Sequence, residues 1–308
     1  MGYTVAMEII GEAALREAIS VSQARTAVHN AFCALAREQV VAPDEFAMKL
    51  DHGGELHIKG AYTGGDVIAF KVATGQFPSG VNSGFTSVID ASTGAPVAIL
   101  DDGGWLTEMR TAAASAVSAV ALARPESSTL AILGGGHQAA FQVAALRDAL
   151  AIDTVRVWSR TSETAERFAS EQHASAMPTV GAAVEDADII VCCTPSTEPL
   201  LTSDMVAPGT HVIAMGADMA GKRELAADLV ASSDVLVCDS LAVASHAGEL
   251  QHVQHSLERW VELGAVLTGQ AVGRTTVDQV TIVDLCGLGI QDAAMAELVM
   301  AHLGTTPS

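Results

Sequence analysis

The sequence predicts an α/β protein that combines a doubly wound parallel sheet of the Rossmann type with a second, α+β domain. A short apolar strand at 130–133 runs into a glycine-rich turn that opens a helix. Later apolar runs recur at the spacing of alternating strands and helices, which is typical of a parallel sheet. Residues 45–100 instead show short alternating runs between turn residues, as expected for a mixed or antiparallel sheet.

The length of 308 residues exceeds one average domain, so we expect two. We assign a nucleotide-binding domain to 125–290, and the other domain to 1–124 together with 291–308. The last helix, near 291–302, could cross back to the first domain, which explains this split. Apolar residues make up 49% and aromatic residues only 4%, which suits closely packed parallel α/β structure.

The formal net charge of −20 makes nucleic acids and anionic membranes poor partners, because the field of the protein repels polyanions. No apolar run approaches the ~20 residues of a membrane span, and the N-terminus lacks a secretory pattern. The five cysteines are scattered without a C-x-x-C pair, as expected for buried, reduced thiols. We therefore expect a soluble, cytoplasmic protein, and we predict no metal site.

The first domain is predicted to begin with an amphipathic helix over 21–40, capped by Ser20 or Ser22. Strands are expected at 55–59, 67–72 and 87–90, with a turn at 92–96.

A second helix is expected over 107–123, with Thr107 as its cap and Arg110 in its first turn. A cation is unfavourable beside the positive end of a helix dipole, so its presence suggests that Arg110 grips an anion. The alternative is an arginine that simply faces solvent.

The glycine-rich turn reads Gly134-x-Gly136-x-x-Ala139, with His137 and Gln138 inside it. Glycines let the backbone approach a pyrophosphate, which the amides of a helix N-terminus bind. Alone this pattern is weak. The next strand, at 155–158, follows about 20 residues on, as a dinucleotide-binding βαβ unit requires.

The residues after that second strand select the dinucleotide. They are Ser159, Arg160 and Thr161, with no carboxylate before Glu163. An NAD site usually offers an acid to the ribose hydroxyl, whereas a guanidinium and hydroxyls suit a 2′-phosphate. We therefore prefer NADP(H), with NAD(H) possible. The alternative is a surface arginine beside a helix cap.

Further strands are predicted at 188–193, 211–215, 234–238 and 280–284, and ligands of such sheets bind beyond the carboxyl ends of the strands. The residues at two of these ends are Thr194, Pro195, Met215, Gly216 and Asp218. Asp218 is the favoured acid, and most other acids are expected on the solvated surface.

Four segments, at 106–115, 133–139, 214–225 and 287–292, together resemble the ornithine cyclodeaminase and mu-crystallin family. Among its members, iminosuccinate reductase is most similar in the His137-Gln138 loop and in the runs 58–60 and 248–252. The resemblance implies a homodimer whose first domain, completed by the C-terminal helix, binds substrate and dimerises. The Rossmann domain then binds the nicotinamide cofactor.

Carried over residue by residue, the resemblance implies that Lys71 is the active-site lysine and that Arg110, beside Thr111, holds the substrate carboxylate. Asp218 matches the acid beside the reacting nitrogen, and Lys59 matches a lysine of only some members. One departure is Phe46, which we align with an additional arginine of many members. Lys59 or Lys49 could supply that charge instead.

We expect an NADPH-dependent reductase that converts an α-imino acid or a cyclic ketimine to an α-amino acid. Neighbouring Arg110 and Lys59 should lower the pKa of Lys71. One alternative is an ornithine or lysine cyclodeaminase that keeps NAD bound and releases ammonia. Another is a non-catalytic, NADP-dependent binding protein of the mu-crystallin type. Lys59 beside a second lysine also suggests a dicarboxylic imino acid as a substrate.

Overall fold

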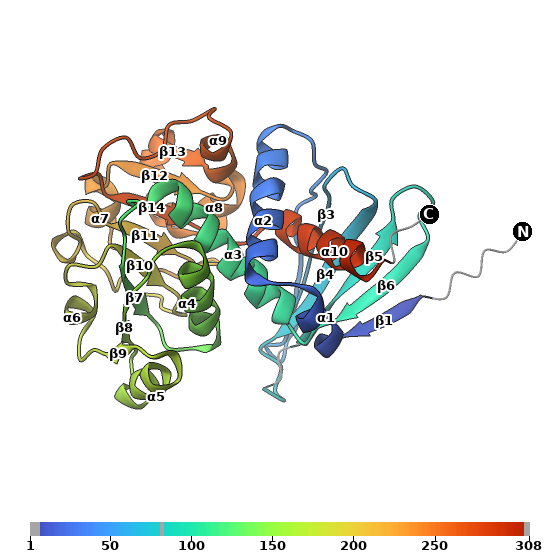
Figure 1. Ribbon diagram of the computed structural model, residues 1–308, viewed down its shortest axis with the longest axis horizontal. Coiled ribbons are helices and arrows are strands. Elements are labelled where there is room, and N and C mark those ends of the chain that lie inside the picture. Colours follow the sequence, from blue (N-terminus) through green and yellow to red (C-terminus); the bar gives the residue numbers. More distant parts are fainter. Residues whose placement is uncertain (1–6, 81–82, 305–308) are drawn as a thin grey trace, which may run out of the picture. The chain divides into compact units, whose positions relative to one another are not determined.

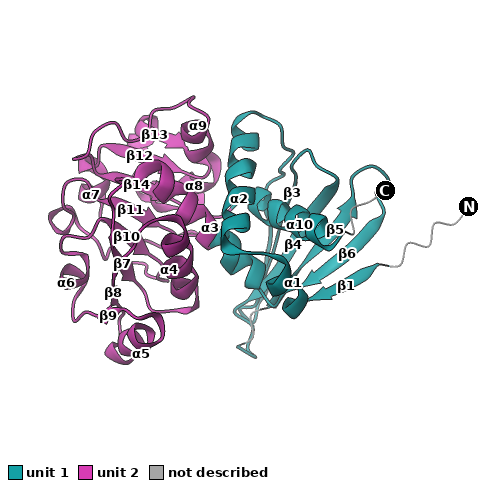
Figure 2. Ribbon diagram, in the orientation of Figure 1, with its two compact units in different colours: residues 1–111, 288–308 teal, residues 112–287 magenta. Residues whose placement is uncertain are grey.

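The computed structural model describes residues 7–80 and 83–304, which form two compact units (Figure 2). Unit 1 comprises 1–111 and 288–308, and unit 2 comprises 112–287. The division falls inside helix α3 (Trp105–Leu122) instead of at residue 124. The end of α3 is held by unit 2, because Arg274 Nε donates to the Leu122 carbonyl at 2.6 Å.

Unit 1 contains a six-stranded sheet in the order β1-β6-β5-β4-β3-β2 (Figure 1). Strand β1 runs parallel to β6, and the remaining neighbours are antiparallel, so the expectation of a mixed sheet is confirmed. Strand β1 was not expected from the sequence, whereas a strand at Phe46, before the strand of Lys59, was implied by the family resemblance. The strands are β1 (Glu8–Gly11), β2 (Phe46–Lys49), β3 (Glu55–Tyr62), β4 (Val67–Gly75), β5 (Ser83–Asp90) and β6 (Pro96–Asp101).

Three helices of unit 1 accompany this sheet: α1 (Glu12–Ala18), α2 (Val21–Ala36) and α10 (Gly289–Leu303). The Ser20 side chain caps α2 in a reciprocal capping box with Gln23, as its sequence predicts. Helix α2 ends earlier than the expected residue 40, because Glu38 takes a left-handed conformation with φ of 56°. Helix α10 packs against α2, β3 and β4, so the C-terminal helix does return to the first unit.

Unit 2 is built on an eight-stranded sheet in the order β13-β12-β14-β11-β10-β7-β8-β9, and every pair in it is parallel. The predicted doubly wound sheet is therefore confirmed. Strands β9 and β13 were not expected. The strands are β7 (Thr129–Leu133), β8 (Thr154–Trp158), β9 (Ser175–Ala176), β10 (Ile189–Cys192), β11 (His211–Ala214), β12 (Val235–Cys238), β13 (Trp260–Glu262) and β14 (Thr281–Asp284).

The crossover helices of unit 2 include α4, which follows the glycine-rich turn, and α5, which follows β8. The α-helices after α3 in this unit are α4 (His137–Ala149), α5 (Ser162–Gln172), α6 (Val180–Val184), α7 (Ala227–Ser232), α8 (Leu241–Ala247) and α9 (Leu263–Leu267). Strands β7, β10, β11, β12 and β14 are buried along nearly their whole length, as expected for a parallel sheet covered on both faces.

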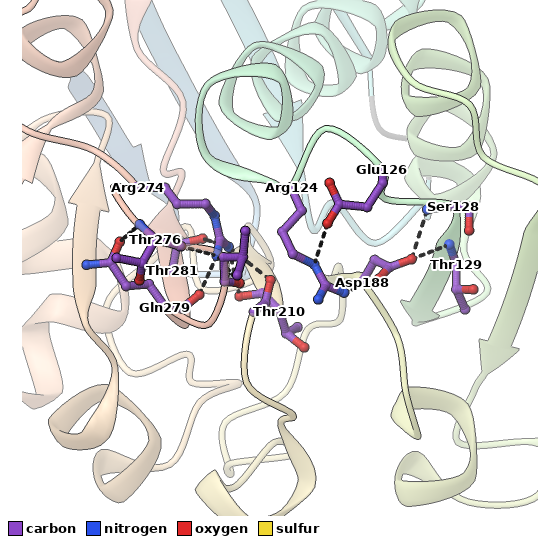
Figure 3. Close-up of polar contacts among 12 residues, drawn as sticks. Arg124, Glu126, Ser128, Thr129, Asp188, Thr210, Arg274, Thr276, Gln279 and Thr281 are labelled. Atoms are coloured by element: carbon purple, nitrogen blue, oxygen red, sulfur yellow. Dashed lines mark hydrogen bonds and ion pairs between the residues drawn. The ribbon is translucent and has the colours of Figure 1, made fainter.

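The amino ends of the strands are tied together by two arginines (Figure 3). Arg124 pairs with Asp188, whose carboxylate also accepts from the backbone amides of Ser128 and Thr129 at 2.8 and 2.9 Å. Arg274 donates to the carbonyl of Gln279 at 2.5 Å and to the Thr281 hydroxyl at 3.2 Å. These contacts join the residues that precede neighbouring strands, so they stabilise the edge opposite to the carboxyl ends where ligands are expected.

Candidate functional site

Three charged side chains from distant parts of unit 1 meet on the face of its sheet that the helices cover. Lys71 lies on β4, Arg110 on α3 and Asp292 near the start of α10. Lys71 Nζ lies 3.1 Å from Asp292 Oδ1, and Arg110 Nε lies 3.3 Å from the same oxygen. All three residues are buried. A buried charge is costly unless it is paired, so the single acid holds the two cations in place.

Burial and its neighbours shift the pKa of each partner in this cluster. The pKa of Lys71 falls to about 8, first because burial disfavours the ammonium and then because Arg110 and Lys59 repel it. Asp292 opposes this shift. The expected direction for Lys71 is therefore found, with burial as its largest cause. Burial raises the pKa of Asp292, but Lys71 and Arg110 outweigh it and hold that pKa below its usual value.

The local structure around Arg110 differs from the sequence expectation. Helix α3 begins at Trp105, and the Asp102 carboxylate accepts from the Leu106 amide at 2.7 Å, so Thr107 is not the cap. Arg110 lies one turn further in, and the argument from the helix dipole was wrong. Its guanidinium is oriented instead by a buried hydrogen bond of 2.8 Å from Nη1 to Gln291 Oε1.

Besides Arg110 Nε, which is ion-paired with Asp292 but not hydrogen-bonded, two buried polar atoms at this cluster have no hydrogen-bond partner within the described ranges 7–80 and 83–304. They are Asp292 Oδ2 and Gln291 Nε2, an acceptor and a donor from adjacent residues of α10. Buried polar atoms are normally satisfied, so a polar ligand is the natural partner for this pair. Thr111, the predicted neighbour of Arg110, donates its hydroxyl to the Thr107 carbonyl at 2.7 Å.

The second lysine of the predicted site is held by an acid that the sequence did not single out. Lys59 Nζ lies 3.3 Å from Glu45 Oε2, and Glu45 Oε1 lies 2.6 Å from His57 Nδ1. Lys59 pairs directly with Lys71 across β3 and β4, so both side chains project from one face. The Lys59 cation is thus present at the predicted site, and the Glu45 carboxylate is paired with it.

The structure also corrects the argument about Phe46. This residue pairs with Ile58, and the alternation of side chains along β3 places Ile58 on the opposite face from Lys59. Phe46 therefore does not occupy a position beside the lysines. Lys49 lies away from the two lysines, because it is opposite Glu55 at the start of β3 and its ammonium pairs with that residue at 3.0 Å.

In unit 2, the glycine-rich turn has the geometry of a dinucleotide cradle. Gly134 has a φ of 113°, and a Cβ there would lie 2.7 Å from the Cys193 carbonyl oxygen. Gly136 precedes α4 without a side-chain cap, and in the part of the chain that the structure describes no neighbouring atom lies within 4 Å of the position of its missing Cβ. The backbone is thus open to a ligand at the helix N-terminus, where phosphates bind.

The other cofactor residues predicted near this turn take the following positions. His137 begins α4 and is exposed, Gln138 accepts from Gln142 at 3.3 Å, and Ala139 is fully buried. Arg160 is exposed directly after β8, between Ser159 and Thr161. The Thr161 hydroxyl donates to the hydroxyl of Thr164 at 2.8 Å and does not cap α5.

The remaining predicted residues lie at the carboxyl ends of β10 and β11. Thr194 and Gly216 both donate to the carboxylate of Glu224, which the sequence did not single out. Pro195 is exposed, and Met215 is buried with its amide 3.1 Å from the Cys192 carbonyl. Asp218 is half exposed and accepts from Lys222 Nζ at 2.5 Å.

Most acids of the described residues are not buried, as expected, but this edge of unit 2 is an exception. The buried carboxyls at or beyond these strand ends are Glu224, Asp239, Glu249 and Asp284. Each accepts hydrogen bonds from loop amides, so these acids shape the loops that follow the strands. An acid inside an apolar run, as in 282–286, was the available signal.

Family comparison agrees with this architecture, since the model of the ornithine cyclodeaminase/mu-crystallin family matches residues 7–305. The chain belongs to this family. Its relatives include a dehydrogenase-type protein of Rhizobium meliloti, 38% identical over 96% of this chain and 95% of the relative. The family contains imine and ketimine reductases as well as ornithine cyclodeaminases. The resemblance stated from the motifs is therefore confirmed.

Two solved structures are similar over nearly the whole chain. An archaeal alanine dehydrogenase dimer with bound NAD superposes with a TM-score of 0.90 at 29% identity, covering 97% of this chain and 96% of the other. The iminosuccinate reductase of Paracoccus denitrificans in complex with NAD⁺ gives 0.89 at 30% identity, with the same coverage. A nicotinamide cofactor therefore fits the family, and the open turn at Gly136 fits its phosphates.

Proposed function

We propose that this chain is an NADPH-dependent reductase that converts an α-imino acid or a cyclic ketimine to an α-amino acid. The observation that carries the proposal is the buried cluster of Lys71, Arg110 and Asp292. It combines a lysine whose pKa is lowered to about 8 with an arginine held by Gln291. Imine reduction needs a proton donor near neutrality and a cation for the substrate carboxylate, and this cluster offers both.

In the proposed reaction Arg110 binds the substrate carboxylate, which it can do with the planar fork of its guanidinium. The Lys71 ammonium donates a proton or hydrogen bond to the imine nitrogen, which makes the imine carbon electrophilic. The reduced nicotinamide supplies the hydride that this carbon accepts. Asp292 keeps Lys71 protonated and oriented, and its unpartnered Oδ2 can accept from the product amine.

Asp218 is proposed to stabilise the positive charge of the protonated imine. Its carboxylate follows β11, at the edge of unit 2 where ligands of doubly wound sheets bind. Lys222 pairs with it and would have to yield this contact to the substrate. This role is supported by the match of 214–225 to the family motif, where Asp218 takes the place of the acid beside the reacting nitrogen.

The preference for NADPH is supported by Ser159, Arg160 and Thr161 at the end of β8. The exposed guanidinium can bond a 2′-phosphate in a bidentate manner. The two solved relatives described above hold NAD. The preference for NADPH is therefore proposed from the residues of this chain alone.

A homodimer is supported by the second face of the sheet in unit 1. The helices of this unit pack on the face that carries Lys71, whereas the opposite face, which we call the outer face, is apolar. It includes Ile9, Phe46, Met48, Ile58, Ile68 and Ile99, which share a face by their cross-strand register. Ile9 is 67% exposed and Phe46 55%. So large an apolar surface is normally covered, and a second copy of this chain offers a matching one.

The experiment that tests the function follows cofactor and product together. Oxo acids mixed with ammonia or methylamine, and preformed cyclic imines, are supplied with NADPH or NADH. The proposal predicts stoichiometric cofactor oxidation and an amino acid product. A cyclodeaminase would instead form proline or pipecolate and ammonia from ornithine or lysine without net cofactor consumption. Tight ligand binding without any turnover would indicate a binding protein.

The location proposed for this enzyme is the cytoplasm. Cys33, Cys192, Cys238 and Cys286 are buried, Cys193 is half-buried, and none of the five forms a disulfide. Reduced cysteines are typical of the cytosol. The described residues contain no helix that is long and apolar enough to cross a membrane.

A further inference from the structure

Glu224 of unit 2 joins the two loops that follow neighbouring strands of the parallel sheet. Its Oε1 accepts from the backbone amide and the hydroxyl of Thr194, both at 2.7 Å. Its Oε2 accepts from the amide of Gly216 at 2.8 Å. Thr194 follows β10 and Gly216 follows β11, and these strands are adjacent in the sheet. One carboxylate thus sets the spacing of two loops at the carboxyl edge.

The backbones of these loops approach each other so closely that only glycine fits at position 216. A Cβ there would lie 2.1 Å from the Thr194 carbonyl oxygen and 2.6 Å from Glu224 Cδ. The Thr194 loop is also next to the dinucleotide cradle, because a Cβ on Gly134 would lie 3.1 Å from Thr194 Cγ2. A shift of the Thr194 loop would therefore reach the glycine-rich turn.

Glu224 is itself held by a second buried acid. Glu249 Oε1 accepts from the Glu224 amide at 2.6 Å, and its Oε2 accepts from the Leu225 amide at 3.2 Å. Both carboxyls are fully or almost fully buried. Glu249 thus positions Glu224, which in turn positions Thr194 and Gly216.

Glu224 accepts a hydrogen bond from each of the three groups that it contacts, so the ionised carboxylate satisfies all of them, whereas a proton on the carboxyl would occupy one of these acceptor positions. Burial raises the pKa of Glu224 to about 7, and Asp218 adds to this rise, while the bonds from Thr194 and Gly216 oppose it. Burial likewise raises the pKa of Glu249 to about 7, and Glu224 contributes to it, whereas Arg223 opposes it. The thiol of Cys192 also lies close enough for Glu224 to raise its pKa.

We propose that Glu224 is a positioning residue for the nicotinamide cofactor, whose ionised carboxylate holds the Thr194 and Gly216 loops in the conformation that accepts the dinucleotide. The inference rests on the nicotinamide cofactor of the proposed function and adds a residue that acts on it through two loops. Glu249 acts one step further away, because it orients the backbone of Glu224.

The test measures NADH binding by its fluorescence from about pH 5.5 to about pH 8.5. Glu224→Gln keeps the shape of the side chain but replaces one acceptor with a donor. We expect its dissociation constant for NADH at the upper end of this range to rise on the order of tenfold. Wild-type affinity should fall as pH drops through about 7, since protonation of Glu224 removes an acceptor, and E224Q should lack this component.

E224Q keeps Glu249, whose pKa is also raised to about 7, so a pH-dependent component that E224Q lacks depends on Glu224. Glu198→Gln is the matched control, since it makes the same chemical change on an exposed residue near Thr194. This control should bind NADH as the wild type does. Thermal unfolding of each variant reports whether the fold is retained.

A second variant keeps the inference testable if E224Q fails to fold. Glu249→Gln weakens the contact with the Glu224 amide but leaves the Glu224 carboxylate in place. This variant should therefore also weaken NADH binding, by a smaller factor than E224Q. If both variants fold, their effects on NADH binding should be less than additive in the double variant, because Glu249 acts through Glu224.

Two results would overturn the inference. One is wild-type NADH affinity that is constant over the pH range. The other is a folded E224Q that binds NADH as tightly as E198Q with the same pH profile. Binding of neither NADH nor NADPH by wild-type protein would refute the cofactor assignment itself, and this role with it. Loss of turnover with intact, pH-dependent NADH binding would instead contradict only the proposed reaction.

Discussion

Lys71 and Asp292 form a buried ion pair, with Nζ of one 3.1 Å from Oδ1 of the other, although they come from opposite ends of the chain. The pair joins the sheet of unit 1 to helix α10, and Arg110 shares the same carboxylate oxygen. It therefore links the stability of the fold to the chemistry proposed for the site.

Replacing Asp292 with asparagine should destabilise the protein by about 3 kcal/mol, because two buried cations would lose their counterion. Chemical denaturation measures this change. Glu12→Gln is the control, since Glu12 pairs with Arg16 at the surface and its loss should matter little. Equal stability of D292N and E12Q would show that the pair contributes no net stability.

The pH dependence of turnover should report Lys71. Its pKa is lowered to about 8, so the protonated donor is abundant below this pH and is lost as pH rises through it. Reduction should accordingly decline above about pH 8. Lys71→Ala should lose at least about a hundredfold in kcat while it retains its fold, whereas Lys49→Ala, at an exposed position, should not. Full turnover by folded K71A would refute the assignment.

Arg160 should decide between the two dinucleotides. Arg160→Gln is expected to weaken NADPH binding by at least about tenfold and to leave NADH binding unchanged, since only NADPH carries the 2′-phosphate. Fluorescence titration with both cofactors measures this. Arg167→Gln removes the same charge from an exposed site on α5 and should change neither affinity. A parallel loss for both cofactors in R160Q would contradict the phosphate role.

Glu45 should limit the charge of the substrate. It lies 3.3 Å from Lys59 and neutralises the cation that suggested a dicarboxylic substrate. Wild-type protein should therefore prefer imino acids with one carboxylate. Glu45→Gln should raise kcat/KM for a dicarboxylic imino acid roughly two- to fivefold relative to a monocarboxylic one. An unchanged ratio would mean that Lys59 does not face the substrate.

The outer face should control assembly. Ile68→Glu places a charge in the middle of this apolar surface, at a residue that is 37% exposed, and should convert a dimer to monomers. Light scattering after gel filtration measures the mass. Val272→Glu changes an even more exposed apolar residue of unit 2 and should leave the dimer intact. A dimeric I68E variant would place the interface elsewhere.

Much of the site could be predicted from the sequence because its signals are local. The turn around Gly134 and Gly136 has a pattern set by backbone geometry, and the residues Ser159–Thr161 lie at a fixed distance from it. Lys71 was identified from the family resemblance and Arg110 from the resemblance and its expected place in a helix, and the structure brings them to one carboxylate. Their roles stay predictions until they are tested.

The sequence by itself determined the parallel sheet of unit 2, the glycine-rich turn and the family, because apolar periodicity and turn chemistry depend on near neighbours along the chain. Only the tertiary structure decided which acids matter. Asp292, Glu45 and Glu224 owe their importance to partners distant in sequence and, for Asp292 and Glu224, to burial. The charge and hydrogen bonding of a carboxylate depend on what surrounds it in space, and that environment exists only in the folded protein.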